Sequence, residues 1–568
     1  MRRYQESNHS RYSLLLLPGV LLLGVLLVQV LFIGRNYVTG WTFAKPVSVV
    51  LIAEETGRIE FGSPEVVEDW IGESIAAHAN RWGTTSIFLT LHYATGIAVD
   101  RWGSSSPVGV VFFLLALFFL FSKVQTPTSG SVKAAFVIAA LGLLLNYQTL
   151  IWYCHGGGWP GISLSLLMIG SLFAYAQGGS RRLFFAFLAM VFLLVQFSVY
   201  HAAAVMSFVF LGVLGAYALA LRAVSHLKGA PPAFRAQMDE RSQHFLNLAM
   251  IAAVMVYMDP VFSFLVEGFG PALLAPVKSA SNFFVSYFEG TNFFSPYHRG
   301  FTLSTRMALF APLVLMLAAS TFFWLRGLAD FWKNDRLSEE QFIAHGLYIT
   351  TVVVLTISTM FGGFPRATEP YFLILLGFPL LLFLPRSGSL PDLAISKGKL
   401  LVGLGMVVIT AFSLVMVMRD PFVGISYASS SEIAASKWAA RTIDVPYFAD
   451  ARLASLVLMK NPHSPIISPS SLLTSPEELD RLFYEGAQDF ATGLRARGAQ
   501  LALLSSRNIE GQGFSEASII TPEYPLRPLP DYDFTSDHFE IVYDNGHSKV
   551  IGPVGDSPPI QDGAVTLP

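Results

Sequence analysis

The segment Val47–Ser74, VSVVLIAEETGRIEFGSPEVVEDWIGES, contains seven carboxylates and a single base, Arg58. It lies between two strongly apolar segments of a 568-residue chain in which 53% of the residues are hydrophobic and only 13% are charged. Soluble domains usually carry about 25% charged residues, so most of this chain is expected to be surrounded by lipid. The acidic segment is therefore predicted to be a loop that lies just outside a membrane.

Apolar runs on both sides of this loop predict a polytopic membrane protein with about eleven transmembrane helices. The first run, from about residue 12 to 34, is longer than the roughly 7–15 residues of a signal-peptide core and long enough to span a bilayer, which takes about 20 residues. We interpret it as a retained helix. The other runs lie near residues 107–124, 131–150, 160–178, 183–200, 202–222, 243–259, 307–325, 342–361, 369–385 and 400–418. The runs 183–200 and 202–222 are the least distinct of these, since one long or broken helix would fit them almost as well as two.

The distribution of basic residues predicts the orientation, because Lys and Arg accumulate in cytoplasmic loops. With a cytoplasmic N-terminus, the connections 151–160 and 200–202 lie outside and contain no Lys or Arg, and the connection 361–369 contains only Arg366. The inside connections all carry basic residues. The pattern predicts a multi-pass protein of the cell membrane with a cytoplasmic N-terminus and an external, periplasmic C-terminal part.

Charge also divides the chain into two expected domains. Residues 419–568 carry 19 acidic and 11 basic residues, a net charge of −8, and residues 1–418 carry +6. The transmembrane domain, 1–418, includes the acidic first external loop, 35–106, and an aromatic external loop, 260–306. The tail, 419–568, alternates predicted helices, such as SSEIAASKWAARTI, with strands, such as AQLALLSS and the hairpin HFEIVYDNGHSKVIGP with its Asn-Gly turn. It is predicted to be a small external α/β domain.

Three acids of the first loop are candidates for chemistry. Glu54 and Glu55 follow the apolar run VSVVLIA, which is expected to hold the backbone against the membrane part. A partly desolvated carboxylate at the lipid–water boundary could act as a general base toward a hydroxyl group. An ordinary juxtamembrane acid pair explains the same residues equally well. Asp69 lies on a helix face shared with other acids, a pattern typical of a solvated surface helix.

The acidic loop is followed by GTTSIFLTLHYATGI, residues 83–97, which is apolar at helical spacing but too short to span a membrane. An acidic first external loop followed by a short helix that ends in Thr-Gly resembles the membrane glycosyltransferases of the GT-C fold, in the branch of prokaryotic relatives of protein mannosyltransferases and oligosaccharyltransferases. The segment QFSVYHAAAVMSF, with His201 at a helix boundary, and the tail with its terminal FEIVYDNGHSKVI are also similar to that family.

The resemblance implies transfer of a sugar from a polyprenyl-phosphate donor to a glycan, lipid or protein acceptor on the outer face of the membrane. In the family an acid of the first loop, usually Asp, serves as the base or as the partner of a metal, so a divalent cation such as Mg²⁺ or Mn²⁺ is compatible with it, although no cofactor follows from the residues. Here Glu54 and Glu55 precede Asp69, the one Asp of the acidic segment. The catalytic acid therefore stays open among these three, and an inactive homologue is also consistent with the sequence.

Basic and imidazole side chains in other external segments are candidates for binding the donor phosphate or a metal. Arg366, in FGGFPRATEP, and His298 with Arg299, in the aromatic loop, could bind phosphate oxygens; for Arg366, pairing with Glu369 is the alternative. His155 and His201 lie at external helix ends. They could share a metal with the acids of the first loop, or His201 could bond to a neighbouring carbonyl.

The sequence thus favours an inverting membrane glycosyltransferase and leaves two alternatives. A transporter or flippase for a lipid-linked or polar solute would need ionisable groups near the middle of its spans, whereas the candidates here lie at helix ends. A polysaccharide polymerase or ligase would use similar donors, with Arg and His residues of a late external loop. The chain contains no basic run that points to a nucleic-acid partner.

Overall fold

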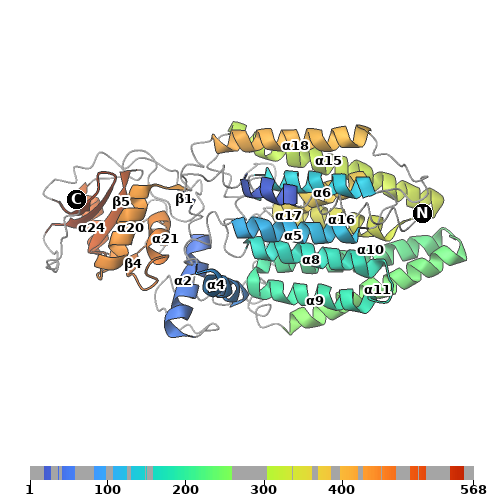
Figure 1. Ribbon diagram of the computed structural model, residues 1–568, viewed down its shortest axis with the longest axis horizontal. Coiled ribbons are helices and arrows are strands. Elements are labelled where there is room, and N and C mark those ends of the chain that lie inside the picture. The colour runs from blue at the N-terminus through green and yellow to red at the C-terminus, as the bar shows by residue number, and fades with distance from the viewer. Residues whose placement is uncertain are drawn as a thin grey trace.

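The computed structural model describes residues 18–26, 36–37, 41–57, 82–96, 107–124, 129–146, 149, 158–258, 303–335, 337–360, 369–384, 397–419, 427–449, 451–467, 487–496, 498–506 and 538–554. These residues form an elongated bundle of apolar helices and, beyond one end of it, a small sheet flanked by helices (Figure 1). Two short helices lie between the bundle and the sheet. They position the candidate site.

The bundle helices coincide with the apolar runs of the sequence. Residues 18–26 are helical. The other helices are α5 (Pro107–Lys123), α6 (Ser129–Leu144), α8 (Gly158–Ala176), α9 (Arg182–Val199), α10 (His201–Leu227), α11 (Pro232–Tyr257), α15 (Leu303–Asn334), α16 (Glu339–Met360), α17 (Glu369–Phe383) and α18 (Lys397–Met418). Within the described residues, α8, α9, α10, α15 and α18 are long and apolar enough to cross a membrane, and α5, α6 and α17 are shorter apolar helices. The chain is therefore a membrane protein.

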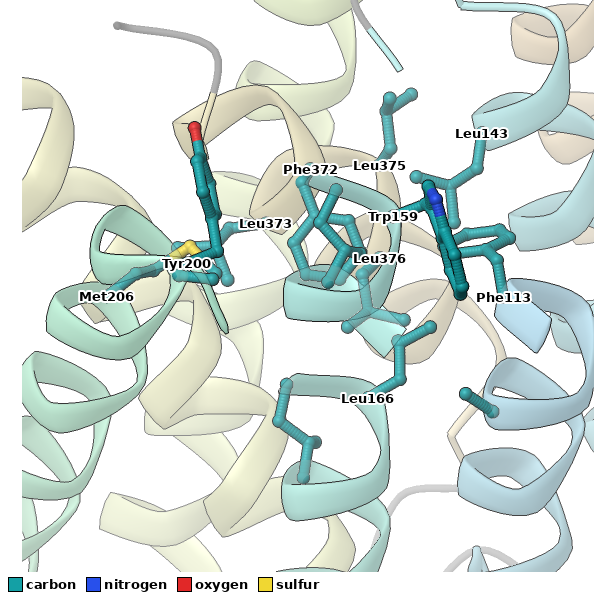
Figure 2. Packing of buried hydrophobic residues seen from close by; sticks show 14 of the residues in the cluster. Phe113, Leu143, Trp159, Leu166, Tyr200, Met206, Phe372, Leu373, Leu375 and Leu376 are labelled. Carbon is teal, nitrogen blue, oxygen red and sulfur yellow. The ribbon is translucent and has the colours of Figure 1, made fainter. Parts of the chain in front are cut away.

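The run of residues 183–222, for which the sequence left one or two helices open, forms two. Tyr200 separates α9 from α10 with an extended backbone, at φ −155° and ψ 100°. Tyr200 is buried in the same hydrophobic cluster as Met206 and Leu373 (Figure 2). A Cβ atom on Gly161 of α8 would lie 2.6 Å from the Cβ atom of Tyr200, so the glycine at that position permits this close packing.

Small residues let the other bundle helices approach one another. Trp159 of α8 packs against α5, where a Cβ atom on Gly109 would lie 3.0 Å from the indole ring. A Cβ atom on Gly170 of α8 would lie 2.9 Å from the Cα atom of Leu120. Because lipid is as apolar as the side chains, van der Waals packing of this kind is what holds membrane helices together. The buried side chains of α5, α6, α8 and α17 fill the space between them (Figure 2).

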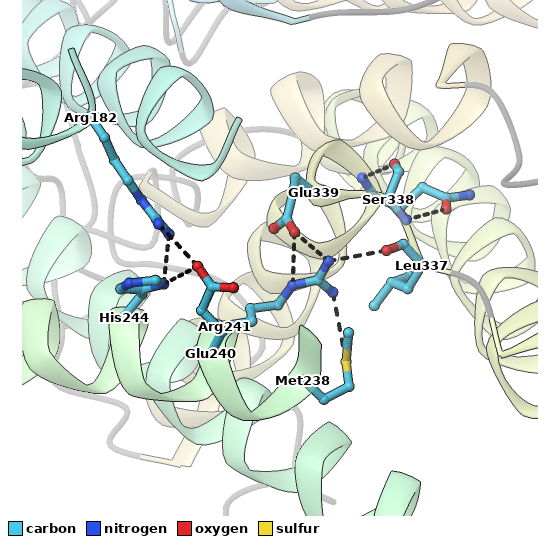
Figure 3. A network of polar contacts seen from close by, with 9 residues as sticks. Arg182, Met238, Glu240, Arg241, His244, Leu337, Ser338 and Glu339 are labelled. Atoms are coloured by element: carbon cyan, nitrogen blue, oxygen red, sulfur yellow. Dashed lines mark hydrogen bonds and ion pairs between the residues drawn. The ribbon is translucent and has the colours of Figure 1, made fainter. Parts of the chain in front are cut away.

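Ion pairs fasten the helices at the end of the bundle that lies away from the sheet. Arg241 of α11 donates from Nε and Nη2 to one carboxylate oxygen of Glu339, over 3.2 and 2.6 Å, and from Nη2 to the carbonyl of Leu337 (Figure 3). Beside it, Arg182 of α9 lies 2.6 Å from Nδ1 of His244. These contacts join the ends of α9, α11 and α16.

The sheet and its helices, called here the C-terminal unit, comprise β2 (Tyr427–Ala428), α20 (Ser430–Thr442), β3 (Tyr447–Ala449), α21 (Ala451–Leu458), β4 (Ile466–Ile467), α24 (Ala487–Ala496), β5 (Leu501–Ser505), β6 (Phe539–Asp544) and β7 (Ser548–Pro553). Its five-stranded sheet has the order β4-β3-β5-β7-β6, with β3 parallel to β4 and β5 and with β7 antiparallel to its neighbours. The hairpin β6–β7 turns at Asn545-Gly546, as the sequence predicts. Ser429 and Glu432 form a capping box at the start of α20.

Two short helices connect this unit to the bundle. The helix α2 (Trp41–Thr56) packs against α21 of the C-terminal unit and against α4 (Trp82–Thr95), and α4 packs against α9 of the bundle (Figure 1). Before α2, the strand β1 (Asn36–Tyr37) pairs with β2 in antiparallel fashion. With 14 residues, α4 is about 21 Å long, shorter than the roughly 30 Å of a bilayer core. It is the short helix that the sequence predicts after the acidic loop.

Candidate functional site

The two leading candidate acids, Glu54 and Glu55, occupy the last turn of α2. The helix ends at Thr56, and the following Gly57 has φ +66°, a left-handed conformation that favours glycine at the end of a helix. Upstream, Val47 and Val50 are fully buried. The buried valines therefore place one face of α2 in the protein interior, and both carboxylates lie at the exposed end of the helix.

The apolar run before the acids packs differently from the expectation. The sequence suggested that VSVVLIA holds the backbone against the membrane part, whereas α2 packs against α4 and against α21 of the C-terminal unit. The hydroxyl of Ser48 donates to the carbonyl of Leu458 in α21, over 3.3 Å. The side chains of Glu54 and Glu55 are 38% and 55% exposed, so the pair lies in contact with solvent.

Glu54 faces a histidine of the neighbouring helix. Its Oε1 lies 3.3 Å from Nε2 of His92, which belongs to the last turn of α4 and is 22% exposed. The ring of His92 also lies 5.3 Å from the ring of Tyr93. The C-terminus of a helix carries a partial negative charge that favours a cationic or donating side chain, so this position suits an imidazole that holds a carboxylate.

The first turn of α4 fixes that histidine relative to the bundle. The hydroxyl of Thr84 donates to the carbonyl of Val199 at the end of α9, over 2.8 Å. A Cβ atom on Gly83 would lie 2.4 Å from the hydroxyl of Ser198, 2.9 Å from a methyl group of Val199 and 3.1 Å from the carbonyl carbon of Ser198, so any larger residue here requires neighbouring atoms at the end of α9 to shift. The helix that carries His92 is therefore anchored at one end to α9.

Glu55 turns away from this pair toward the C-terminal unit. Its Oε2 lies 2.9 Å from Nε2 of His463, and both side chains are more than half exposed. The turn that carries His463 is held by Asn461, whose Oδ1 accepts from the His463 amide and whose side-chain amide donates to the carbonyl of Ala440. Two adjacent carboxylates thus contact two histidines from different parts of the fold.

The described residues include only part of the remaining candidates. Asp69, His155, His298, Arg299 and Arg366, and with them the aromatic loop 260–306, lie outside the described residues. His201 is the first residue of α10, and its side chain is likewise not described. Its backbone follows Val199 by two residues, so the start of α10 lies next to the anchored end of α4.

Neither carboxylate–histidine pair is by itself a metal centre. Among the described residues, no group of three or more His, Cys, Asp or Glu side chains is arranged to hold a metal ion. Mg²⁺ and Mn²⁺ prefer several oxygen ligands, and each pair offers a single carboxylate. A divalent cation at this place would need ligands from the segments that are not described.

His92 and His463 are the two residues of this site that the sequence analysis did not single out. His92 lies three residues before Thr95 of the Thr95-Gly96 helix end on which the family resemblance depends, so a local sequence signal lay close to it. His463 is 408 residues away from Glu55. No local pattern marks such a pairing, because it depends on how the C-terminal unit packs against α2.

Comparison with solved structures finds similar chains, among them the following three structures. The archaeal oligosaccharyltransferase AglB from Archaeoglobus fulgidus, in complex with an inhibitory peptide and a dolichol-phosphate, is 11% identical with a TM-score of 0.47, and the match covers 87% of this chain and 69% of that one. The apo oligosaccharyltransferase of the same organism is 12% identical with a TM-score of 0.43, over 87% and 70% of the two chains. The arabinofuranosyltransferase AftD from Mycobacteria is 13% identical with a TM-score of 0.47, over 95% of this chain and 42% of that one.

These proteins are glycosyltransferases of the GT-C fold, the family that the sequence resembles. No protein-family model matches the chain, and no curated protein matches it in sequence. With identities of 11–13% and TM-scores below 0.5, the similarity does not define an activity for this chain.

Proposed function

We propose that this protein is an integral membrane glycosyltransferase in which Glu54 is the general base. It would transfer a sugar from a polyprenyl-phosphate donor to a hydroxyl group of an acceptor on the outer face of the membrane. The observation that carries this proposal is the contact of Glu54 with His92, over 3.3 Å, at the junction between the bundle and the C-terminal unit. In this proposal the lipid-linked donor would reach the junction from the bundle side and the acceptor from the side of the C-terminal unit.

The proposed reaction is a single displacement. The carboxylate of Glu54 takes the proton of the acceptor hydroxyl, and the acceptor oxygen forms a bond to the anomeric carbon. The bond between that carbon and the phosphate oxygen breaks, and its electron pair leaves with the polyprenyl phosphate. Attack from the face opposite the leaving group inverts the anomeric centre. The imidazole of His92 holds the carboxylate in position, as a second side chain commonly orients a catalytic base.

Glu54 is a better candidate than Glu55 for two reasons. It is the less exposed of the two carboxylates, and its histidine belongs to α4, which is anchored to the bundle through Thr84. Glu55 instead contacts the C-terminal unit. A base must be held within hydrogen-bonding reach of the acceptor. The contact of Glu54 with a histidine on a helix that is fixed to the bundle meets this requirement better than the exposed contact of Glu55 with His463.

The remaining parts of the proposal come from the sequence. We propose about eleven spans with a cytoplasmic N-terminus, the orientation that the basic residues favour; the C-terminal unit and α2 would then lie on the outer face. Arg366, His298 and Arg299 are proposed to bind the donor phosphate, where planar guanidinium groups suit phosphate oxygens. Asp69 is the alternative base or a metal partner. The acceptor belongs to the cell envelope, as a glycan, lipid or protein.

A transporter is less well supported. Carriers place ionisable groups near the middle of their spans, whereas the Asp, Glu, Lys and Arg residues of α8, α9, α10, α15 and α18 lie toward the helix ends or are absent. The candidate pair lies outside these spans altogether.

A transfer assay in detergent micelles distinguishes the two functions, because micelles have no compartments between which a solute could be carried. The purified full-length protein would be mixed with radiolabelled polyprenyl-phosphate hexoses or pentoses and a membrane extract as the source of acceptor. We expect label to move from the lipid to a water-soluble or protein fraction. Donor that stays intact in micelles but crosses the bilayer of protein-containing vesicles would contradict the proposal and indicate a flippase.

A further inference from the structure

One exposed face near the end of α15 combines basic and apolar side chains. Its members follow one another at intervals of three, four and seven residues, which places them on one side of the helix. They are Phe322, Leu325, Arg326, Trp332 and Lys333. The three apolar side chains are 57%, 53% and 62% exposed, in that order, and both bases are exposed as well. These five residues are called here the basic face of α15.

The spacing of charges along α15 matches the thickness of a bilayer. Residues 307–325, between Arg306 and Arg326, carry no charged side chain. At 1.5 Å per residue this run is about 28 Å long, close to the roughly 30 Å of a hydrocarbon core. Arg326 then lies where the core ends, and Lys333 lies about 10 Å farther along the helix, at the level of the headgroups. Trp332 suits the same level, because tryptophan is enriched at membrane interfaces.

The two bases of this face are unpaired within the described part of the chain. Neither Arg326 nor Lys333 forms an ion pair or a hydrogen bond with another described residue. Of the two nearest acids along the chain, Asp335 pairs with Lys228, and the interaction of Asp330 involves neither base. A charged side chain beside a hydrocarbon core is costly without a counter-charge, so this face suits an external anion.

A third base lies close to this face. Lys397 is the first residue of α18, is exposed, and has no partner among the residues that the structure describes. The helices α15 and α18 run side by side along one edge of the bundle (Figure 1), and Lys399 and Gly327 line the same small cavity between them. The start of α18 therefore lies level with Arg326. Leu401, one turn farther along α18, is 73% exposed, so apolar side chains of two helices border the bases.

We propose that the basic face of α15, together with Lys397, binds the headgroup of an anionic phospholipid in the membrane leaflet at this end of the bundle. The guanidinium of Arg326 donates two hydrogen bonds to phosphate oxygens, which its planar shape favours. Lys333 and Lys397 add positive charge. Phe322 and Leu325 lie on the hydrocarbon side of Arg326 and contact the beginning of the acyl chains.

A lipid fits this surface better than a soluble protein does, because exposed apolar side chains at the level of the hydrocarbon core border the bases. Clusters of bases at the cytoplasmic ends of membrane helices attract anionic lipids, and this end is cytoplasmic in the orientation that the basic residues favour. The surface lies at the end of the bundle away from Glu54 and plays no part in the proposed reaction.

The test compares two double variants of the full-length protein. Arg326→Gln with Lys333→Gln removes one arginine and one lysine from the basic face. The control, Lys437→Gln with Arg441→Gln, removes the same two kinds of base from α20 of the C-terminal unit, where both are exposed and neither is paired with a described residue. Native mass spectrometry would give the affinity of each protein for phosphatidylglycerol and for phosphatidylcholine in the same detergent.

We expect the wild type to prefer phosphatidylglycerol. This preference should fall about tenfold or more in the α15 variant, because each base near an anionic membrane surface strengthens binding about fivefold. The control should keep the wild-type preference. Equal affinities of the wild type for the two lipids, an unchanged preference in the α15 variant, or an equal loss in the two double variants would each overturn the proposal.

A third double variant separates the effect of charge from that of substitution itself. Arg326→Lys with Lys333→Arg exchanges the two bases and keeps both charges. Because these side chains are exposed, every variant is expected to unfold at the wild-type temperature without added lipid. We expect the exchange to preserve most of the preference for phosphatidylglycerol. A loss as large as in the glutamine variant would show that positive charge at these positions does not bind the lipid. The measurement is lipid binding alone, so its outcome does not depend on the proposed sugar transfer.

Discussion

Nε2 of His463 in the C-terminal unit lies 2.9 Å from Oε2 of Glu55 in α2. Its sequence neighbour Glu54 lies 3.3 Å from His92 of α4, so two consecutive carboxylates at the end of one helix contact two different parts of the fold. The last turn of α2 therefore links the C-terminal unit to the helix that is anchored on the bundle.

The pair of Glu55 and His463 is expected to contribute little to stability. Both side chains are more than half exposed, and exposed ion pairs typically contribute about 0–1 kcal/mol. His463→Ala should therefore lower the free energy of unfolding by less than about 1 kcal/mol, as measured by thermal or denaturant unfolding in detergent. A loss of several kcal/mol would contradict this and show that the contact is a structural clamp.

The buried pair of Arg241 and Glu339 is expected to behave in the opposite way. The Arg241 side chain is only 3% exposed, and its removal takes the donor away from the carboxylate of Glu339, which is 25% exposed, and from the carbonyl of Leu337. Arg241→Ala should cost about 1.5–3 kcal/mol, the range for hydrogen bonds to charged groups. The matched control is Arg222→Ala, since Arg222 lies 2.7 Å from Asp239 but both side chains are substantially exposed. Equal losses of stability in the two variants would contradict the prediction.

The contact of Gly83 with the end of α9 is expected to control the position of α4. Gly83→Ala places a methyl group against the backbone of Ser198, and overpacking of this kind typically costs about 1–3 kcal/mol. We expect α4 to shift and the contact between His92 and Glu54 to be lost. Transferase activity should then fall by more than the reduced stability alone explains.

A matched control for this variant is Gly212→Ala in α10, where an added Cβ atom meets nothing within 4 Å. Replacing an unhindered glycine inside a helix by alanine is neutral or favourable. Activity would be measured with the transfer assay, and the helix contact by a disulfide or spectroscopic probe between α2 and α4. Unchanged activity in Gly83→Ala would show that α4 does not position the site.

The C-terminal unit is expected to be sensitive to alkaline pH through Tyr447. This residue of β3 is fully buried, and burial raises the pKa of its phenol above the ordinary value of about 10. The unfolded chain releases this proton near pH 10 and the folded chain does not, so the stability is fully present below pH 10 and falls as the pH rises above it.

Tyr447→Phe should therefore remove part of the loss of stability above pH 10. The measurement is the unfolding temperature of wild type and variant between pH 8 and 11. An identical decline in the two proteins would show that other groups cause it.

Sequence patterns predicted a helical membrane protein and the positions of the described bundle helices, and they predicted the site only in part. Apolar length defines a span locally, so every bundle helix falls on an apolar run, and the capped start of α20 at Ser429 and the Asn545-Gly546 turn are also local signals. The break at Tyr200 was left open because no proline or glycine marks it; packing of the tyrosine against Gly161 of α8 decides it. The charges of Glu54 and Glu55 mark these residues in the sequence. Their contacts with His92 and His463 depend on tertiary packing, which no local pattern shows.

Comparison of Glu54→Gln with Glu55→Gln decides whether Glu54 is the base. The two variants remove the same charge from adjacent residues of one helix end, so each controls for folding of the other. General-base catalysis typically contributes about 10²–10⁴-fold. We predict that Glu54→Gln lowers kcat by at least about 100-fold while donor binding is retained, and that Glu55→Gln stays close to wild type. A Glu54→Gln variant that transfers sugar at the wild-type rate would contradict the claim.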